Sequence, residues 1–199
     1  MAGLFVTLEG IDRSGKSTQA ALLADALGDE AVVVREPGGT TAGERIRDIL
    51  KDPDVTLTPE GEALLFAAAR AELVRQVISP ALAEGKVVVC DRFLDSSLAY
   101  QGEARGLGVE LVEAINAPAV DGLVPDLTLL LVVSPDAIAE RGTEDDRFER
   151  EGGGLQEAVA WAYAELADAE PARWRRIDAF GPPEEVHAQI LAAVREARG

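Results

Sequence analysis

The sequence predicts a doubly wound α/β fold, in which about five parallel strands form one sheet with helices on both faces. Short apolar runs alternate with longer segments of helical apolar spacing along the whole chain. These runs are apolar throughout rather than at every second position, which is typical of strands covered by helices on both faces. At 199 residues, with no linker, repeat or low-complexity tract, the chain is expected to form a single domain over residues 1–199.

The first quarter of the chain supplies two strand–helix pairs. Leu4–Leu8 (LFVTL) is expected to be a buried strand that ends before Gly10, and Lys16–Leu27 has the apolar spacing of a helix. Ala31–Arg35 (AVVVR) is expected to be the second strand, because this apolar run precedes a turn-like Pro-Gly-Gly. Thr41–Leu50 then returns to helical spacing.

The remaining elements continue the same alternation. Pro59–Leu82 is expected to be a long helix, with Thr58 and Pro59 suited to its N-cap and first helical position. Val87–Asp91 (VVVCD) and Leu127–Val133 (LTLLLVV) are apolar enough to be buried strands. The late elements are a weak strand at Trp174–Asp178 and helices at Leu155–Ala169 and Pro183–Arg198.

Composition and charge limit the kinds of molecule that the chain is expected to bind. The chain has 19 basic and 36 acidic residues, a net charge of −17. Binding a polyanion over a broad surface needs clustered positive charge, so neither nucleic acids nor anionic membranes are expected as partners. A small anionic ligand remains possible, because 16 of the 19 basic residues are Arg, which suits bidentate phosphate contacts.

Cysteine and histidine content excludes further classes of site. One cysteine, Cys90, and one histidine, His187, leave no internal disulfide, no Cys-based zinc cluster and no His-rich metal site. The sequence does not begin with a charged and then apolar signal sequence, and no apolar run approaches the length of a membrane span. A cytoplasmic protein is therefore expected.

A phosphate loop connects the first strand to the first helix. The string GIDRSGKS, from Gly10 to Ser17, matches G-x-x-x-x-G-K-[ST] in the strand–loop–helix context that this motif requires. Glycines let backbone N–H groups close around a polyphosphate, and the helix N-terminus adds a favourable dipole. Lys16 is expected to reach the β- and γ-phosphates of ATP, and the Ser17 hydroxyl to ligate Mg²⁺. The expected nucleotide-binding residues are Gly10, Ile11, Asp12, Arg13, Ser14, Gly15, Lys16, Ser17 and Thr18.

The phosphate loop predicts that the fold is that of a P-loop NTPase. Besides Lys16, the loop contains a second candidate for a catalytic residue. Arg13 lies inside the loop, where a guanidinium can reach the transferring phosphoryl group as an internal arginine finger. An exposed surface arginine is the alternative interpretation.

An Asp-Arg pair follows the Val87–Asp91 strand directly. Asp91, at the carboxyl end of a parallel strand beside the phosphate loop, is placed to hold Mg²⁺ through water. Arg92 would then point into the crevice where ligands of such sheets bind. A surface ion pair is the alternative.

Four further residues are candidates for the acceptor side. Phe66 and Arg70 are four positions apart and share one helix face, where an aromatic plane and a fork of donors can meet a base. Taken alone, Phe66 is better explained as a core residue than as a platform for a base. In a polar segment beyond Asp91, Gln101 can read a base edge and Tyr100 can pack against a sugar.

Several reaction classes are compatible with a nucleotide site. The GTPase signature Asn-Lys-x-Asp is absent, since the sole Asn, Asn116, precedes Ala117, and the chain is too small for most motor ATPases. A kinase for a small acceptor is the leading class. The alternatives are a kinase for a different nucleoside monophosphate and a nucleotide-dependent switch without an acceptor.

Five segments together resemble thymidylate kinases in order and spacing. They are LEGIDRSGKSTQ, REPGGT, LLFAAAR, DRF with SSLAYQG, and PDLTLLL, and the match as a whole runs from Leu4 to about Leu166. The resemblance implies transfer of the γ-phosphoryl group of ATP to dTMP, giving dTDP and ADP for dTTP synthesis, with Mg²⁺. It also implies a homodimer.

The resemblance further implies roles for individual residues. Asp12 would contact the acceptor sugar near its 3′-hydroxyl, and Arg92 would bind the acceptor phosphate. Phe66 would stack on thymine and Arg70 would hydrogen-bond to it, while Tyr100 would leave no room for a 2′-hydroxyl. Base-edge contacts would come from Ser97 and Gln101, and Glu36 would line the acceptor side.

A lid is the last element implied. Charge alone favours a solvated loop for Glu140–Gly154, but the family places a short lid at about 141–154. Arg141 would lie over adenine, and Arg147 and Arg150 would neutralise the transferring phosphates. The chain departs from many relatives in having Phe93 where they have Tyr or His, and in carrying arginines in both loop and lid.

Overall fold

The computed structural model describes residues 3–133 and 153–199. In this part of the chain, five parallel strands form one sheet in the order β2-β3-β1-β4-β5, which confirms the predicted fold class. In the register, Val6 pairs with Val89 of β3 and Leu127 of β4. The strands are β1 (Leu4–Glu9), β2 (Ala31–Arg35), β3 (Val87–Asp91), β4 (Leu127–Val132) and β5 (Trp174–Asp178).

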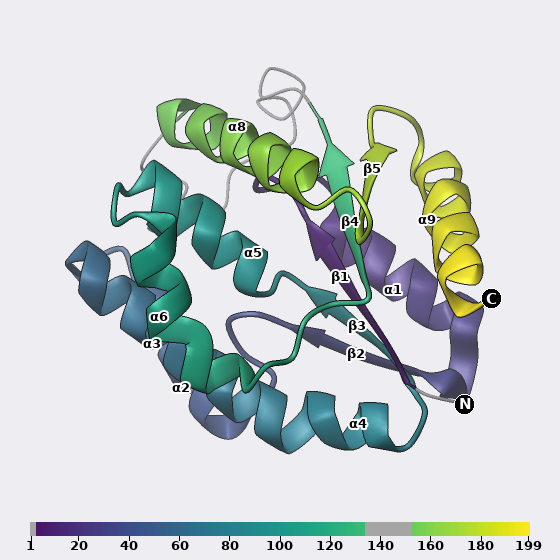
Figure 1. Cartoon of the computed structure of the whole chain (residues 1–199), viewed down its shortest axis with the longest axis horizontal. Helices are drawn as coiled ribbons and strands as arrows, with labels where there is room; N and C mark the ends of the chain where they lie inside the picture. The colour runs from purple at the N-terminus through teal and green to yellow at the C-terminus, as the bar shows by residue number, and fades with distance from the viewer. Residues whose placement is uncertain (1–2, 134–152) are drawn as a thin grey trace.

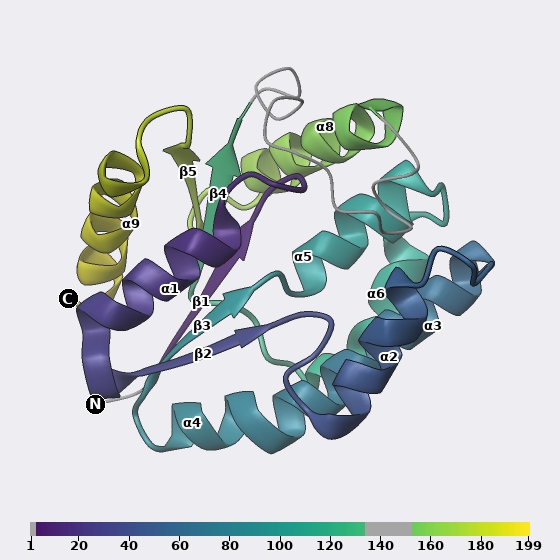
Figure 2. The same ribbon diagram turned by 180° about the vertical axis from the view of Figure 1, so that it is seen from behind.

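Helices cover both faces of the sheet (Figure 1, Figure 2). One face carries α1 (Lys16–Leu27) and α9 (Pro183–Arg198), which also pack against each other. The other face carries α3 (Pro59–Leu73), the π-helical η2 (Val74–Ile78), α4 (Ser79–Ala83) and α8 (Gly153–Ala169). The remaining helical segments are η1 (Gly28–Glu30), α2 (Thr41–Lys51), α5 (Leu94–Ser97), the π-helical η3 (Leu98–Ala104) and α6 (Val109–Val120).

Apolar residues on β1 divide between the two faces because successive strand side chains point in opposite directions. Val6 belongs to the same buried cluster as Leu23 of α1, whereas Phe5 is buried with Leu73 and Ile78 beneath α3 and η2. Each fully buried side chain of this size contributes about 1.5–3 kcal/mol relative to exposure. The continuous apolar character of the strand thus stabilises both layers.

Threonine caps begin two of the helices. The Thr58 hydroxyl accepts a hydrogen bond from Gly61 N at 3.2 Å, and Pro59 follows at the first position, as predicted. At α2 the Thr40 hydroxyl accepts from Gly43 N at 2.9 Å. Each cap satisfies one backbone donor that the first helical turn leaves unpaired.

Several regions differ from the sequence prediction or extend it. The helix expected over Pro59–Leu82 is present, but its helical path is interrupted by the π-helical turn η2. Helix α6 was not predicted. It contains Pro118, a residue that disfavours a helix locally, and it packs against α3. Of the predicted lid at 141–154, residues 153 and 154 begin α8, and the rest lies outside the described residues.

Candidate active site

The phosphate loop lies at the carboxyl edge of the sheet, between β1 and α1. Gly10 and Gly15 both have positive φ, 141° and 100°, a conformation that a residue with a side chain rarely adopts. A Cβ on Gly10 would lie 2.8 Å from the Leu131 carbonyl oxygen of the neighbouring strand. The glycines of the motif therefore allow the chain to turn sharply and begin α1 at Lys16.

The side chain of Lys16 folds back into the phosphate loop. Its Nζ donates hydrogen bonds to the Ile11 carbonyl at 2.7 Å, the Gly10 carbonyl at 3.1 Å and the Ser14 hydroxyl at 3.2 Å. Burial, with a further contribution from the Arg92 charge, lowers the pKa of Lys16 to about 8. The ammonium is thus held at the centre of the loop and remains mainly charged at neutral pH.

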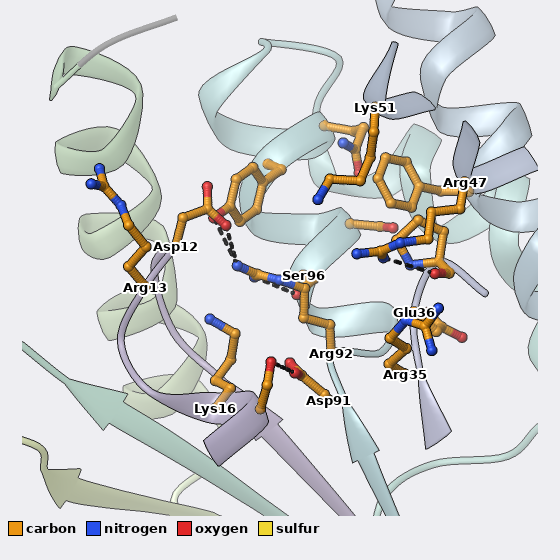
Figure 3. Close-up of a pocket in the computed structure, with 16 residues that line it drawn as sticks. Asp12, Arg13, Lys16, Arg35, Glu36, Arg47, Lys51, Asp91, Arg92 and Ser96 are labelled. Atoms are coloured by element: carbon orange, nitrogen blue, oxygen red, sulfur yellow. Dashed lines mark hydrogen bonds and ion pairs between the residues drawn. The ribbon is translucent and has the colours of Figure 1, made fainter. Parts of the chain in front are cut away.

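Ser17 and Asp91 bring two oxygen atoms together beside Lys16. The Ser17 hydroxyl donates to Asp91 Oδ2 at 2.5 Å, across the junction between α1 and the end of β3 (Figure 3). Hydroxyl and carboxylate oxygens beside a phosphate loop are ligands that Mg²⁺ accepts, usually with phosphate and water oxygens completing its shell. The two predicted metal ligands therefore fit this ion.

Arg92 directly follows β3 and occupies the centre of the site. Its Nη2 donates to Asp12 Oδ1 at 2.5 Å and to the Tyr100 hydroxyl at 3.3 Å, and its guanidinium lies 5.1 Å from the centre of the Tyr100 ring. Burial would raise the pKa of Asp12, but the Arg92 and Lys16 charges outweigh it and lower that pKa. A fixed cation and an ionised carboxylate therefore face the same cavity.

A buried network behind Arg92 was not found by sequence analysis. Nη1 of Arg92 donates to the hydroxyls of Ser96 and Tyr163, each at 3.2 Å, and both hydroxyls also contact Glu9 Oε2, at 2.6 and 2.7 Å. Glu9 is completely buried, and burial, reinforced by the charge of Asp95, raises its pKa to about 7. In the sequence, the sign of this network is that the otherwise apolar strand β1 ends in a glutamate.

The acceptor side of the cavity is built from three elements. Phe66 of α3 lines it together with Ser97 of α5 and with Tyr100 and Gln101 of η3. Sequence analysis placed Tyr100 and Gln101 in a polar segment near the crevice; they lie in a π-helical turn, a geometry often found at functional sites. Glu36 contributes a buried Oε1 that has no hydrogen-bond partner among the described residues.

Arg70 lies behind this wall rather than on it. It is 1% exposed and is not among the described residues that line the cavity. Its Nε and Nη2 donate to Glu36 Oε2 at 2.9 and 2.6 Å, Nη2 also donates to the Ser97 hydroxyl at 3.1 Å, and Nη1 donates to Asn116. In this structure Arg70 therefore holds Glu36 and Ser97 in place.

Three cations that sequence analysis did not single out also line the cavity. Arg35 ends β2, and Arg47 and Lys51 lie one helical turn apart on α2 (Figure 3). The four-residue spacing of Arg47 and Lys51 was a signal for a shared helix face. They add positive charge to the cavity lining, where Arg35 also forms an ion pair with Glu44 at 2.7 Å.

The structure brings most of the predicted site residues together. The cavity measures about 280 Å³. Arg13 lines it too, but Figure 3 shows its head group turned away from Arg92 and Asp91. Arg141, Arg147 and Arg150 lie outside the described residues. The predicted residues lining the cavity are Asp12, Arg13, Lys16, Ser17, Glu36, Phe66, Asp91, Arg92, Ser97, Tyr100 and Gln101; Gly10, Ile11, Ser14, Gly15 and Thr18 do not line it.

Comparison with known proteins identifies the family. The sequence profile described as thymidylate kinase matches residues 8–190. The chain belongs to the thymidylate kinase family. It is 50% identical to the thymidylate kinase of Pelotomaculum thermopropionicum over 204 residues, which cover 98% of this chain and 94% of that one. The corresponding protein of Deinococcus radiodurans is 46% identical over 201 residues, covering 98% and 97%.

A solved thymidylate kinase supports the same assignment. The crystal structure of the enzyme from Ehrlichia chaffeensis matches with a TM-score of 0.82 and 31% identity, covering 98% of this chain and all of that one. Within residues 3–133 and 153–199, every helix is too short or too polar to span a bilayer. In the same described part, no cluster of three or more His, Cys, Asp or Glu side chains suits a metal ion.

Proposed function

We propose that this chain transfers the γ-phosphoryl group of ATP to dTMP, forming dTDP and ADP, with the cavity as the acceptor site. One observation supports placing the reaction in this cavity. The phosphate-loop cation Lys16 and the strand-end cation Arg92 face the same cavity as an aromatic and amide wall formed by Phe66 and Gln101. Phosphate recognition and base recognition are thus available at the two ends of one site.

The chemistry requires positioning and charge neutralisation more than covalent participation by the protein. The attacking oxygen of the acceptor phosphate is already anionic, so no strong general base is needed. Lys16, Arg92 and Arg13 would share the negative charge of the transition state with Mg²⁺. Ser17 and Asp91 would hold that ion, whose role is to neutralise the charge on the phosphate oxygens.

Asp12 would bind the acceptor nucleotide rather than transfer a proton. Its pKa is lowered, so it remains an acceptor-only carboxylate, and one oxygen is already fixed by Arg92. Its Oδ2 accepts from Gln156 Nε2 at 2.7 Å, which holds the carboxylate plane. A contact from the sugar 3′-hydroxyl to this carboxylate is supported by that orientation.

Residues of the acceptor wall would recognise the nucleoside. Phe66 would stack on the base, Ser97 and Gln101 would meet its edge, and Tyr100 would close the space beside C2′ of the sugar. The unpaired Oε1 of Glu36 supports a contact with a donor on the substrate. Arg70 would reach the base only by exchanging one of its present partners, and otherwise supports it through Ser97 and Glu36.

Other parts of the proposal rest on the resemblance to the family. Arg141 would cover adenine, and Arg147 or Arg150 would assist Arg13, all in a lid at about 141–154. We also propose one domain over residues 1–199 and a cytoplasmic location, for which the single buried thiol Cys90 is suitable.

The last part of the proposal is that the chain forms a homodimer. The adjacent helices α2, α3 and α6 each carry an exposed apolar side chain, Ile49, Leu64 and Leu111 respectively. These side chains support a contact with a second copy. Sedimentation velocity of the wild type and of Leu64→Glu tests it: the wild type should sediment as a dimer and the variant should shift toward monomer, and a monomeric wild type would contradict the proposal.

The reaction itself is tested by ADP release with Mg-ATP and one acceptor at a time: dTMP, dUMP, UMP, CMP, AMP or none. We expect strong stimulation by dTMP. A Lys16→Met preparation made in parallel measures contaminating kinases, because that variant lacks the loop cation. Stimulation only by another acceptor would keep the kinase chemistry and reject the proposed substrate, and slow turnover unaffected by any acceptor would indicate a switch.

A further inference from the structure

Helix α3 presents Glu62, Phe66 and Arg70 at intervals of four residues, and therefore along one face. Phe66 lines the cavity and Arg70 supports its wall, as described above. Glu62 extends the same row by one turn but belongs to neither the phosphate site nor the metal site. It is 1% exposed, and a carboxylate buried to this degree requires partners.

The partners of Glu62 come from η3 and from the residue that follows it. Gln101 Nε2 donates to Glu62 Oε1 at 2.8 Å. Arg105 Nε donates to the same oxygen at 3.2 Å, and Arg105 Nη2 donates to Oε2 at 3.1 Å. Because Arg105 grips both oxygens, it fixes the plane of the carboxylate that Gln101 faces.

This contact determines which way the Gln101 amide is turned. An ionised carboxylate only accepts hydrogen bonds, so the amide nitrogen of Gln101 must face Glu62. The amide oxygen is then directed away from Glu62. Gln101 lines the cavity together with Phe66, so the group it offers to a base stacked there is an acceptor.

We propose that Glu62, held by Arg105, is a positioning residue that sets the Gln101 amide and thereby selects the base of the acceptor nucleotide. A fixed acceptor favours a pyrimidine with an N–H at N3, as in thymine and uracil. It disfavours cytosine, whose N3 carries a lone pair. This inference rests on the proposed function, because it assumes that the nucleoside end of dTMP occupies the wall formed by Phe66 and Gln101.

The test compares the dissociation constants of dTMP and dCMP by isothermal titration calorimetry without ATP. In Glu62→Gln the side chain at 62 can donate as well as accept, so the Gln101 amide is free to turn over. We expect the ratio of the dCMP constant to the dTMP constant to fall by about 3- to 10-fold, the value of one hydrogen bond. Glu60→Gln, an exposed position on the same helix, should leave the ratio unchanged.

A double-mutant cycle separates positioning through Gln101 from a general structural effect. In a Gln101→Ala background, adding Glu62→Gln should no longer change the ratio. An equal fall in both backgrounds, or no fall in the wild-type background, would overturn the inference. If wild-type protein binds dTMP tightly and only the ratio fails to respond, the proposed function stands; if it does not bind dTMP, the proposed function fails as well.

A second variant keeps the test decisive if Glu62→Gln does not fold, as judged by thermal unfolding. Arg105→Ala removes a side chain that is 18% exposed, and with it the two Arg105 hydrogen bonds to the Glu62 carboxylate. The dCMP to dTMP ratio should then fall by about twofold or more, with a smaller change than expected for Glu62→Gln. An unchanged ratio in Arg105→Ala would overturn the inference in the same way.

Discussion

Replacing Glu9 by Gln should change how the stability of the protein depends on pH. Glu9 has no solvent exposure and accepts hydrogen bonds from Phe93 N, the Ser96 hydroxyl and the Tyr163 hydroxyl. Gln has nearly the same shape. Its oxygen can keep the Phe93 contact, and its NH₂ group can donate to hydroxyls that also act as acceptors. The substitution therefore removes a titratable group and leaves the network largely satisfied.

The magnitude follows from the pKa of Glu9, which burial and the Asp95 charge raise from 4.5 to about 7. Between these values the folded protein retains a proton that the unfolded chain has lost, so its stability is full below pH 4.5 and falls as the pH rises through 7. The shift corresponds to a loss of about 3 kcal/mol in the free energy of unfolding, with roughly three quarters of it between pH 5 and pH 8.

Urea unfolding followed by circular dichroism at pH 5, 6, 7 and 8 measures this difference. Wild-type protein should lose roughly 2 kcal/mol more than Glu9→Gln over that interval. Groups that do not interact with Glu9, such as Glu36, cancel in the comparison. Glu113→Gln, an exposed position on α6, should behave like the wild type. Parallel pH profiles for wild type and Glu9→Gln would refute the argument that Glu9 is protonated in the folded state.

Three further predictions concern catalysis, selectivity and folding. Arg13→Ala should lower kcat by roughly 10³-fold with little change in the KM for dTMP, since an arginine finger acts in the transition state; steady-state kinetics showing an unchanged kcat would assign that role to Arg147 or Arg150. Tyr100→Ala should raise kcat/KM for UMP relative to dUMP, because it opens space beside C2′, and equal selectivity in both proteins would reject a steric role for Tyr100. Thr40→Ala should lower the free energy of unfolding by about 1 kcal/mol, because Gly43 N loses its cap, whereas an unchanged urea midpoint would show that water replaces the hydroxyl.

The fold was predictable because its signals are local. Apolar runs marked four of the strands and a weaker pattern marked β5, and for β2, β3 and β5 the predicted boundaries match the structure. Helix α6 was not predictable in this way, because Pro118 argues against a helix in a local reading of the sequence. The segment that contains Tyr100 and Gln101 reads as polar, yet both side chains are buried in η3.

The same distinction between local signals and long-range contacts applies to the candidate site. The phosphate loop, Lys16 and Ser17 are contiguous in the chain, so one motif and its strand–helix context locate them. Tyr163 lies on α8, outside every motif that the sequence analysis identified. Its role beneath Arg92 depends on a hydrogen bond to Glu9, which lies 154 positions away in the sequence.

The sequence by itself determined the parallel α/β architecture, the phosphate loop and the family resemblance, because each depends on residues close together in the chain. Tertiary structure alone decided that Arg70 lies behind the acceptor wall and that Glu62 faces Gln101, which is 39 positions away. The physical reason is that these contacts depend on how α3 packs against α6 and η3. Packing between distant elements determines which donor meets which acceptor, and no local pattern of residues records that choice.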